Sequence, residues 1–415
     1  MGRRDSKFIF MAVFSISLIA FGFIVDTPEE ILHGIVRILV ESDILISDYI
    51  GIGGIGAAFV NSGLLTLIFT MLLHKLEINF NGPAFASLFI VAGFALFGKN
   101  LFNVWFIVLG VYLYARFHKD KFSKYIYIAL FGTTLAPIVT EIILNTSLPM
   151  HTRLPLGLFT GMSIGFLLPP LSTYLLRVHQ GFNLYNIGFT GGLIGTIYVS
   201  VFKSYGLLPN SRVIWTTGNN ALLGIFLAVL FFIMIALGIF MDRNIKHSYK
   251  NILGYSGRLV SDFVLLEGFG PSLVNMGICG LIGTIYIVII GGDLNGPTIG
   301  GIFTIVGFGG FGKHPKNILP IFAGVFLGSI TKIWGINDPS IQLAALFGTA
   351  LAPIAGEFGW YFGVLAGFLH SSVVLNVGVL HEGLNLYNNG FAAGIVAAFL
   401  VPIIQAFRKD ESDEA

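Results

Sequence analysis

The chain contains the same unit twice, and this duplication limits the available folds more than any other feature. With an offset of 214 residues, Asp48–Asn103 aligns with Asp262–Asn317 without a gap, and 19 of the 56 aligned positions are identical. Two later motifs recur in the same order: LFGTTLAPIVTE returns as LFGTALAPIAGE, and HQGFNLYNIGF returns as HEGLNLYNNGF. Matches that keep their order along both halves indicate a tandem duplication of about 200 residues.

The composition determines the solvent in which this unit must fold. Of the 415 residues, 55% are hydrophobic and only 11% are charged, and the mean hydropathy is +0.85. Soluble domains carry about 25% charged residues, so the composition excludes a soluble enzyme. A net charge of +2 offers no basic face for nucleic acid. We therefore predict a multi-pass membrane protein whose surroundings are the lipid bilayer and which binds no nucleic acid.

The residues that carry most enzyme and metal chemistry are scarce. A single cysteine, Cys279, excludes a disulfide framework, a thiolate zinc site and an iron–sulfur cluster. The two recurring histidines, His179 and His381, are too few for a metal site, and no spacing supports a nucleophile–base pair. The sequence therefore predicts no catalytic residue, no metal and no cofactor.

Each copy contains seven apolar stretches, which predicts an all-α protein. Their lengths suit membrane helices, which need about 20 residues. The stretches cover roughly 8–25, 50–73, 83–98, 101–117, 125–145, 155–176 and 184–204 in the first copy, and roughly 218–241, 269–290, 297–312, 317–331, 340–356, 359–378 and 386–406 in the second. Gly-Pro opens the third stretch and Gly-Thr…Ala-Pro interrupts the fifth. Each copy therefore has either seven crossings or five crossings and two half-crossings.

Either number of crossings is odd, so the second copy must insert upside down relative to the first. The loop charges agree with this. Residues 26–48 carry six acidic side chains and one basic one, whereas the matching residues 242–262 carry four basic and two acidic ones. Basic loops face the cytoplasm, so matched loops of opposite charge indicate inverted-topology repeats. The same rule places both termini in the cytoplasm.

The expected organisation is a first membrane repeat at 1–205, a linker at 206–217, a second, inverted repeat at 218–407 and a disordered polar tail at 408–415. Inverted repeats recur in transporters and channels, where the solute site lies near the membrane midplane between the repeats. Non-helical backbone is tolerated there only inside protein or beside a water-filled cavity. Polar or helix-breaking motifs present in both copies are therefore the candidates for the pathway.

The first such motif is Asn-Gly-Pro. Asn81 and Pro83 recur as Asn295 and Pro297. Asn is a favoured N-cap and Pro is favoured in the first turn, so one interpretation is simply the start of a helix. The alternative is that two half-helix N-termini direct their positive dipole ends at a solute.

Two lysines and two asparagines accompany this motif. Lys99 and Lys313 follow in matched Phe-Gly-Lys sequences, where a lysine can cap the last carbonyls of a helix. The alternative role is a cation that lines the pathway and binds the solute. Asn61 and Asn275 lie inside the preceding apolar stretch and are also candidates for the pathway.

The second motif combines a helix break with a carboxylate. Ala-Pro removes a helical hydrogen bond, and Thr133 or Thr349 can bond to a carbonyl freed there. Glu141 and Glu357 follow four residues after the prolines. An ionisable group in or beside a membrane span indicates a functional site, so these carboxylates are candidates for binding a cation, carrying a proton or accepting hydrogen bonds. The alternative is a carboxylate at the membrane surface.

The third motif places amides beside a tyrosine. It comprises Asn183, Tyr185 and Asn186 in the first copy and Asn385, Tyr387 and Asn388 in the second. An amide both donates and accepts hydrogen bonds, which suits an uncharged polar solute. Helix capping and hydrogen bonding between helices are the alternative.

The motifs NGP…GFGGFGKHPKN, LFGTxLAPIxxE and HxGxNLYNxGF resemble those of a family of uncharacterised bacterial membrane proteins, domain-of-unknown-function family 1576. The resemblance covers most of the chain, and its most specific part is Phe311–Asn317. It implies the bacterial inner membrane and supplies no activity. Ala58–Ile68 (AFVNSGLLTLI) is also similar to the F-x-N-N-P-x-x-G element of urea transporters, which have inverted repeats with paired half-helices, although its proline is missing.

These features predict a transporter that moves a small polar solute or ion through a midplane site, with a proton or Na⁺ as coupling ion. A passive channel or facilitator for a neutral solute is the first alternative, and a membrane-embedded enzyme is the second. The sequence does not identify the solute, the direction of transport or the oligomeric state.

Overall fold

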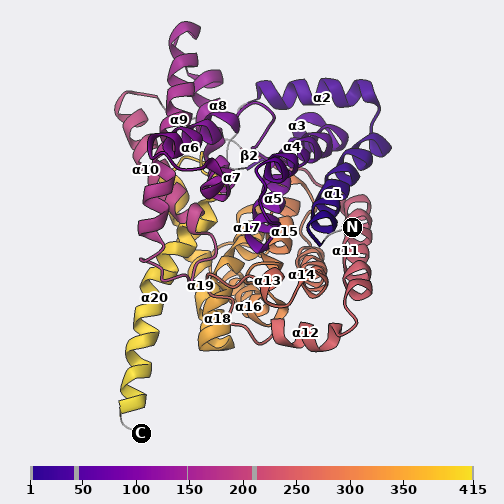
Figure 1. Ribbon diagram of the computed structural model, residues 1–415. Helices are drawn as coiled ribbons and strands as arrows, with labels where there is room; N and C mark the ends of the chain where they lie inside the picture. Colours follow the sequence, from indigo (N-terminus) through magenta and orange to yellow (C-terminus); the bar gives the residue numbers. More distant parts are fainter. Residues whose placement is uncertain (1–2, 42–45, 147, 208–212, 414–415) are drawn as a thin grey trace.

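The computed structural model describes residues 3–41, 46–146, 148–207 and 213–413, which are almost entirely helical (Figure 1). The first half contains α1 (Arg3–Val25), α2 (Pro28–Val40), β1 (Ile46–Ser47), α3 (Tyr49–Gly53), α4 (Ile55–Lys75), α5 (Gly82–Phe94), α6 (Trp105–Phe117), η1 (Phe122–Lys124), α7 (Ile126–Gly132), η2 (Thr133–Leu135), α8 (Ala136–Thr140), the π-helix η3 (Glu141–Asn145), α9 (Met150–Leu175) and α10 (Asn186–Ser204). The second half contains β2 (Val213–Ile214), α11 (Asn220–Met241), α12 (Ile245–Ile252), α13 (Phe263–Leu266), α14 (Phe269–Ile289), α15 (Gly296–Gly309), α16 (Pro315–Thr331), α17 (Pro339–Gly348), η4 (Thr349–Leu351), α18 (Ala352–Phe358), α19 (Trp360–Val377), η5 (Gly378–Leu380) and α20 (Asn388–Asp413).

Nine helical segments within these described ranges are long and apolar enough to cross a membrane. They cover 6–25, 55–75, 126–145, 150–175, 220–241, 269–289, 339–358, 360–380 and 388–408. They agree with the multi-pass membrane protein that the composition predicts, because an apolar helix satisfies its own backbone hydrogen bonds in lipid.

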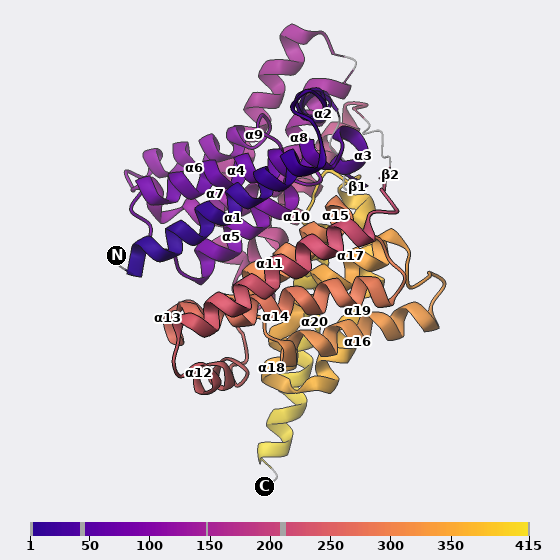
Figure 2. The same cartoon turned by 90° about the vertical axis from the view of Figure 1, so that its right-hand side faces the viewer.

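Helix packing follows the same scheme in the two halves. α1 packs against α4 and α6 against α9 in the first half, while α11 packs against α14 and α16 against α19 in the second. Figure 2 shows the first half above the second, with α5 and α15 between them. The halves are joined by packing of α5 on α15 and of α10 on α20, and by the parallel pairing of β1 with β2.

The contact between α5 and α15 depends on glycine. A Cβ added to Gly93 would lie 2.7 Å from Gly300 O, which is closer than any side chain allows. Small residues let helix backbones approach closely, which is how helices pack in membranes. The two backbones therefore touch directly at the centre of the molecule.

α5 and α15 are also short, with 13 and 14 residues. At a rise of about 1.5 Å per residue each extends about 20 Å, less than the hydrocarbon thickness of about 30 Å. Their length agrees with half-crossings for the third stretch of each copy. The fifth stretches, 126–145 and 339–358, are long enough to cross.

The break predicted in the fifth stretch is confirmed. η2 and η4 are 3-10 turns that directly precede the Ala-Pro steps at Pro137 and Pro353, because a proline inside a helix lacks the N–H and displaces the carbonyl four residues earlier. The hydroxyls of Thr133 and Thr349 donate to the carbonyls three residues earlier, at 2.7 and 2.6 Å.

The structure describes parts of the expected tail and linker. A disordered tail is expected from residue 408, and α20 runs from Asn388 to Asp413. Residues 414–415 lie outside the described ranges. In the expected linker, 206–217, Val213 pairs with Ile46, and 208–212 lie outside the described ranges.

Candidate functional site

The N-termini of α5 and α15 lie where the two halves meet, and side chains cap both. Asn81 Oδ1 accepts a hydrogen bond from Ala84 N at 3.1 Å, and Asn295 Oδ1 accepts one from Thr298 N at 3.1 Å. A proline occupies the first turn of each helix. The interpretation of Asn-Gly-Pro as the start of a helix is therefore confirmed.

Each of these N-termini also binds an aspartate from the opposite half. Asp262 accepts hydrogen bonds from Gly82 N at 3.0 Å through both carboxylate oxygens, and Asp48 Oδ1 accepts one from Gly296 N at 3.1 Å. A carboxylate is stabilised at the positive end of a helix dipole. Protein carboxylates occupy these two helix ends.

Sequence reasoning missed Asp48 and Asp262. The sequence did hold a signal, because Asp48 and Asp262 are the first identical pair of the alignment at an offset of 214 residues. Without the fold, nothing in that signal showed that each carboxylate bonds to the other half of the chain.

The C-terminal ends of the two short helices are held by asparagine. Asn61 Nδ2 donates to the backbone oxygen of Lys99 at 2.9 Å, and Asn275 Nδ2 donates to that of Lys313 at 2.7 Å. Each amide also donates to a carbonyl at the end of its short helix, at 2.7 Å. These bonds satisfy carbonyls that would otherwise be unpaired in lipid, and they position the two lysines.

Both lysines are fully buried, but their side chains have different surroundings. Lys313 Nζ donates to the hydroxyl of Tyr185 and to Thr349 Oγ1, the latter at 2.7 Å. Lys99 Nζ lies 5.0 Å from the centre of the Phe94 ring and has no hydrogen-bond partner within the described residues. The two halves thus differ at matched positions.

The Asn-x-Tyr-Asn motifs form two turns that meet between the halves. The ring centres of Tyr185 and Tyr387 are 4.7 Å apart. Asn183 Oδ1 accepts a hydrogen bond from Tyr185 N at 2.9 Å, and Asn385 Oδ1 accepts one from Tyr387 N at 3.0 Å. The amides therefore hold the turns that present the two tyrosines to each other.

The second asparagine of each motif bonds to a neighbouring helix. Asn186 Nδ2 donates to Ser172 O at 3.0 Å, and Asn388 Nδ2 donates to Val374 O at 3.2 Å. For these two side chains the alternative interpretation, hydrogen bonding between helices, describes the observed contacts.

A cavity of about 190 Å³ lies beside the tyrosine pair. Residues of both halves line it, among them Pro83, Tyr127, Asn186, Tyr185, Phe308 and Tyr387. A second cavity, of about 110 Å³, is lined by Asn388 and Asn389. Pockets for drug-sized ligands measure about 300–1,000 Å³, so both cavities suit a solute of only a few atoms.

The structure does not bring Glu141 and Glu357 together. Glu141 begins η3, directly after α8, and Glu357 lies in α18; α8 and α18 are at opposite ends of the molecule (Figures 1 and 2). Glu141 is buried and accepts a hydrogen bond from Asn145 Nδ2 at 2.8 Å, whereas Glu357 is exposed. The two carboxylates therefore do not form one site.

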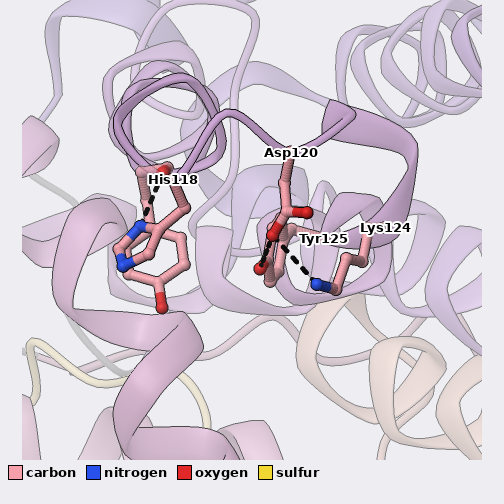
Figure 3. Close-up of polar contacts among 5 residues, drawn as sticks. His118, Asp120, Lys124 and Tyr125 are labelled. Atoms are coloured by element: carbon pink, nitrogen blue, oxygen red, sulfur yellow. Dashed lines mark hydrogen bonds and ion pairs between the residues drawn. The ribbon is translucent and has the colours of Figure 1, made fainter.

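The loop before α7 holds a separate polar cluster (Figure 3). Asp120 Oδ2 accepts hydrogen bonds from the Tyr125 hydroxyl and, at 2.9 Å, from Lys124 Nζ. The bond from Tyr125, followed by that from Lys124, lowers the pKa of Asp120 below its ordinary value. None of these side chains lines the larger cavity, so the cluster stabilises the loop rather than the site.

Within the described ranges, no group of three or more His, Cys, Asp or Glu side chains is arranged to hold a metal ion. The long apolar helices, the two short central helices and the buried polar turns define a polytopic helical membrane protein. The chain belongs to the family described as protein of unknown function (DUF1576), whose sequence model matches residues 27–204 and 241–406. This confirms the resemblance inferred from the motifs. No curated protein and no solved structure matches the chain.

Proposed function

We propose that this protein is a transporter of the bacterial inner membrane, built from two inverted repeats, 1–205 and 218–407. A small polar solute or ion crosses it between the two repeats, beside Tyr185 and Tyr387. The observation that carries the proposal is the cavity of about 190 Å³, which residues from both halves line where the two tyrosine turns meet.

The arrangement of helices supports the inverted topology. α1 and α11, which begin the two repeats, run in opposite directions, and α2 and α12, which follow them, lie at opposite ends of the molecule (Figure 2). α2 carries Glu29 and Glu30 in its first turn, whereas α12 carries Lys246 and Lys250. Because basic segments stay in the cytoplasm, the α12 end is the cytoplasmic one, and both termini lie there.

The contacts at the centre support a route between the repeats. α5 and α15 are half-crossings whose ends are held by polar side chains from both halves. In transporters with inverted repeats, such broken helices border the solute site. Non-helical backbone at this depth agrees with a cavity or pathway, because lipid would leave its polar groups unsatisfied.

Flux into proteoliposomes tests the proposal. Vesicles with the purified protein are given radiolabelled urea, acetate or inorganic phosphate, and uptake is compared with that of empty vesicles. We expect uptake of at least one probe, and we expect the Tyr185→Ala, Tyr387→Ala double variant to lose it. Tyr205→Ala is the matched control, because Tyr205 is 81% exposed. Uptake no faster than in empty vesicles for all three probes would refute the proposal.

Coupling to an ion separates a carrier from the passive facilitator. Uptake that continues unchanged after the proton and sodium gradients are collapsed identifies a facilitator. For a coupled carrier, the double change Glu141→Gln with Glu357→Gln is expected to abolish gradient-driven uptake while leaving membrane insertion intact. Normal gradient-driven uptake by that double variant would remove both carboxylates from the coupling mechanism.

A further inference from the structure

Two matched groups of side chains lie at the C-terminal ends of α5 and α15, and only one of them is internally bonded. In the bonded group, the ammonium of Lys313 is held by the hydroxyls of Tyr185 and Thr349. In the matched group, Lys99 Nζ and the Tyr387 hydroxyl are both fully buried, and neither has a hydrogen-bond partner within the described residues.

Lys99 and Tyr387 both lie against the Phe94 ring. The Phe94 ring lies 5.0 Å from Lys99 Nζ, and its centre lies 5.1 Å from that of the Tyr387 ring. The preceding residues also meet, because a Cβ on Gly98 would lie 2.6 Å from a methyl carbon of Leu386. Tyr387 in turn lines the cavity of about 190 Å³.

The turn that carries Tyr387 holds a further unbonded donor. Asn385 Nδ2 is buried without a partner in the described structure, whereas its counterpart Asn183 Nδ2 donates to Gly390 O at 2.9 Å. An ammonium, a phenol hydroxyl and an amide NH₂ all donate hydrogen bonds. The second-half turn and Lys99 therefore hold three donors without a partner within the described residues, and Asn388 Oδ1 of the same turn is an acceptor without one.

Burial of these donors is costly unless something accepts from them. An unpaired buried donor costs about 1–3 kcal/mol, and a charged one more. Asp48 and Asp262 bond to backbone N–H groups instead. A neutral solute would leave the ammonium charge uncompensated, and a cation would be repelled by it. An anion with oxygen acceptors satisfies both the charge and the hydrogen bonds.

We propose that the transported solute is a small oxyanion, of carboxylate or phosphate type, and that it binds at Lys99 and the Tyr387 hydroxyl. This inference rests on the proposed transport function and specifies its substrate class. Lys313 is the internally bonded counterpart, whose ammonium already donates to the hydroxyls of Tyr185 and Thr349.

The test compares two variants with a matched control in the same proteoliposomes. Lys99→Gln removes the charge, and Tyr387→Phe removes only one hydroxyl. If Lys99→Gln disturbs the structure, the smaller change in Tyr387→Phe still tests the anion site. Lys316→Gln is the control, since Lys316 is exposed and lies close to the other buried lysine in sequence. Size-exclusion profiles and circular dichroism verify that each variant is folded.

The probes are radiolabelled acetate, inorganic phosphate and urea. We expect saturable uptake of acetate or phosphate, with a half-saturating concentration about tenfold or more higher in Lys99→Gln and raised in Tyr387→Phe, because a hydrogen bond to a charged group contributes about 1.5–3 kcal/mol. Lys316→Gln is expected to behave as the unaltered protein. Anion uptake that is identical in all four proteins overturns the anion site.

Failure of the substrate class is distinguishable from failure of the transport function. Uptake of urea alone, unchanged in the Lys99 variant, overturns the oxyanion proposal and leaves the transporter in place. No uptake of any of the three probes overturns both.

Discussion

Asp48 and Asp262 each bond to the opposite half of the chain, and we expect an Asp→Asn substitution to destabilise the protein to different extents at the two positions. Asp48 uses both oxygens for different donors: Oδ1 accepts from Ile50 N at 3.0 Å and from Gly296 N at 3.1 Å, and Oδ2 accepts from Thr216 N at 3.1 Å. An asparagine at this position has one accepting oxygen and one NH₂ group. At least one of the three backbone donors therefore loses its partner in Asp48→Asn.

Asp262 distributes its bonds differently. Oδ1 accepts from Leu265 N and from Gly82 N, both at 3.0 Å, and Oδ2 accepts a second time from Gly82 N. The single oxygen of Asp262→Asn can keep both donors. Both substitutions remove a charge from a helix N-terminus, at about 0.3–1 kcal/mol each, and this contribution cancels in the comparison. What remains is one partly buried, unpaired N–H, that of Thr216; a fully buried one costs about 1–3 kcal/mol, which sets the upper bound.

We therefore expect Asp48→Asn to lower the free energy of unfolding by up to about 3 kcal/mol more than Asp262→Asn. The measurement is unfolding of the purified protein in mixed micelles titrated with sodium dodecyl sulfate, followed by circular dichroism. Asp338→Asn is the control, because its bond to Gly335 N is exposed and exposed substitutions stay within about 0.5 kcal/mol. Asp262→Asn proving equally or more destabilising would refute the reasoning.

Two further predictions concern topology and pH. Cys279 is buried and is the only cysteine in the sequence, so the labelling is done in a Cys279→Ser background. We expect Lys246→Cys on α12 to react with an impermeant maleimide only from the cytoplasmic side, and Glu29→Cys on the matching α2 only from the other side; labelling of both from the same side would exclude inverted topology. Because Tyr125 lowers the pKa of Asp120 below its ordinary value of 3.8, the stabilisation of the loop by this carboxylate is complete above 3.8 and is lost as the pH falls through the lower folded value. Tyr125→Phe should raise the Asp120 midpoint in a ¹³C-carboxyl NMR titration, and an unchanged midpoint would show that the hydrogen bond contributes nothing.

The sequence showed which residues of the site recur in both halves, but it did not show which of them contact one another. The sequence showed that Asn61 and Lys99 recur as Asn275 and Lys313, and it suggested a pathway role for all four. The structure shows the asparagines bonded to the lysine carbonyls, which makes them positioning groups. Glu141 and Glu357 recur equally well in sequence, yet α8, which directly precedes Glu141, and α18, which contains Glu357, are at opposite ends of the molecule.

The sequence by itself determined the membrane environment, the duplicated order of helices, the short third stretch and the break before each Ala-Pro. These follow from local properties, since charge content, apolar length and proline act within a few residues of the chain. Only the tertiary structure decided which polar groups meet. Asp262 reaches Gly82 across 180 residues and Asp48 reaches Gly296 across 248. Such pairs depend on how whole helices pack, and the same packing leaves Lys99 unbonded where Lys313 is held.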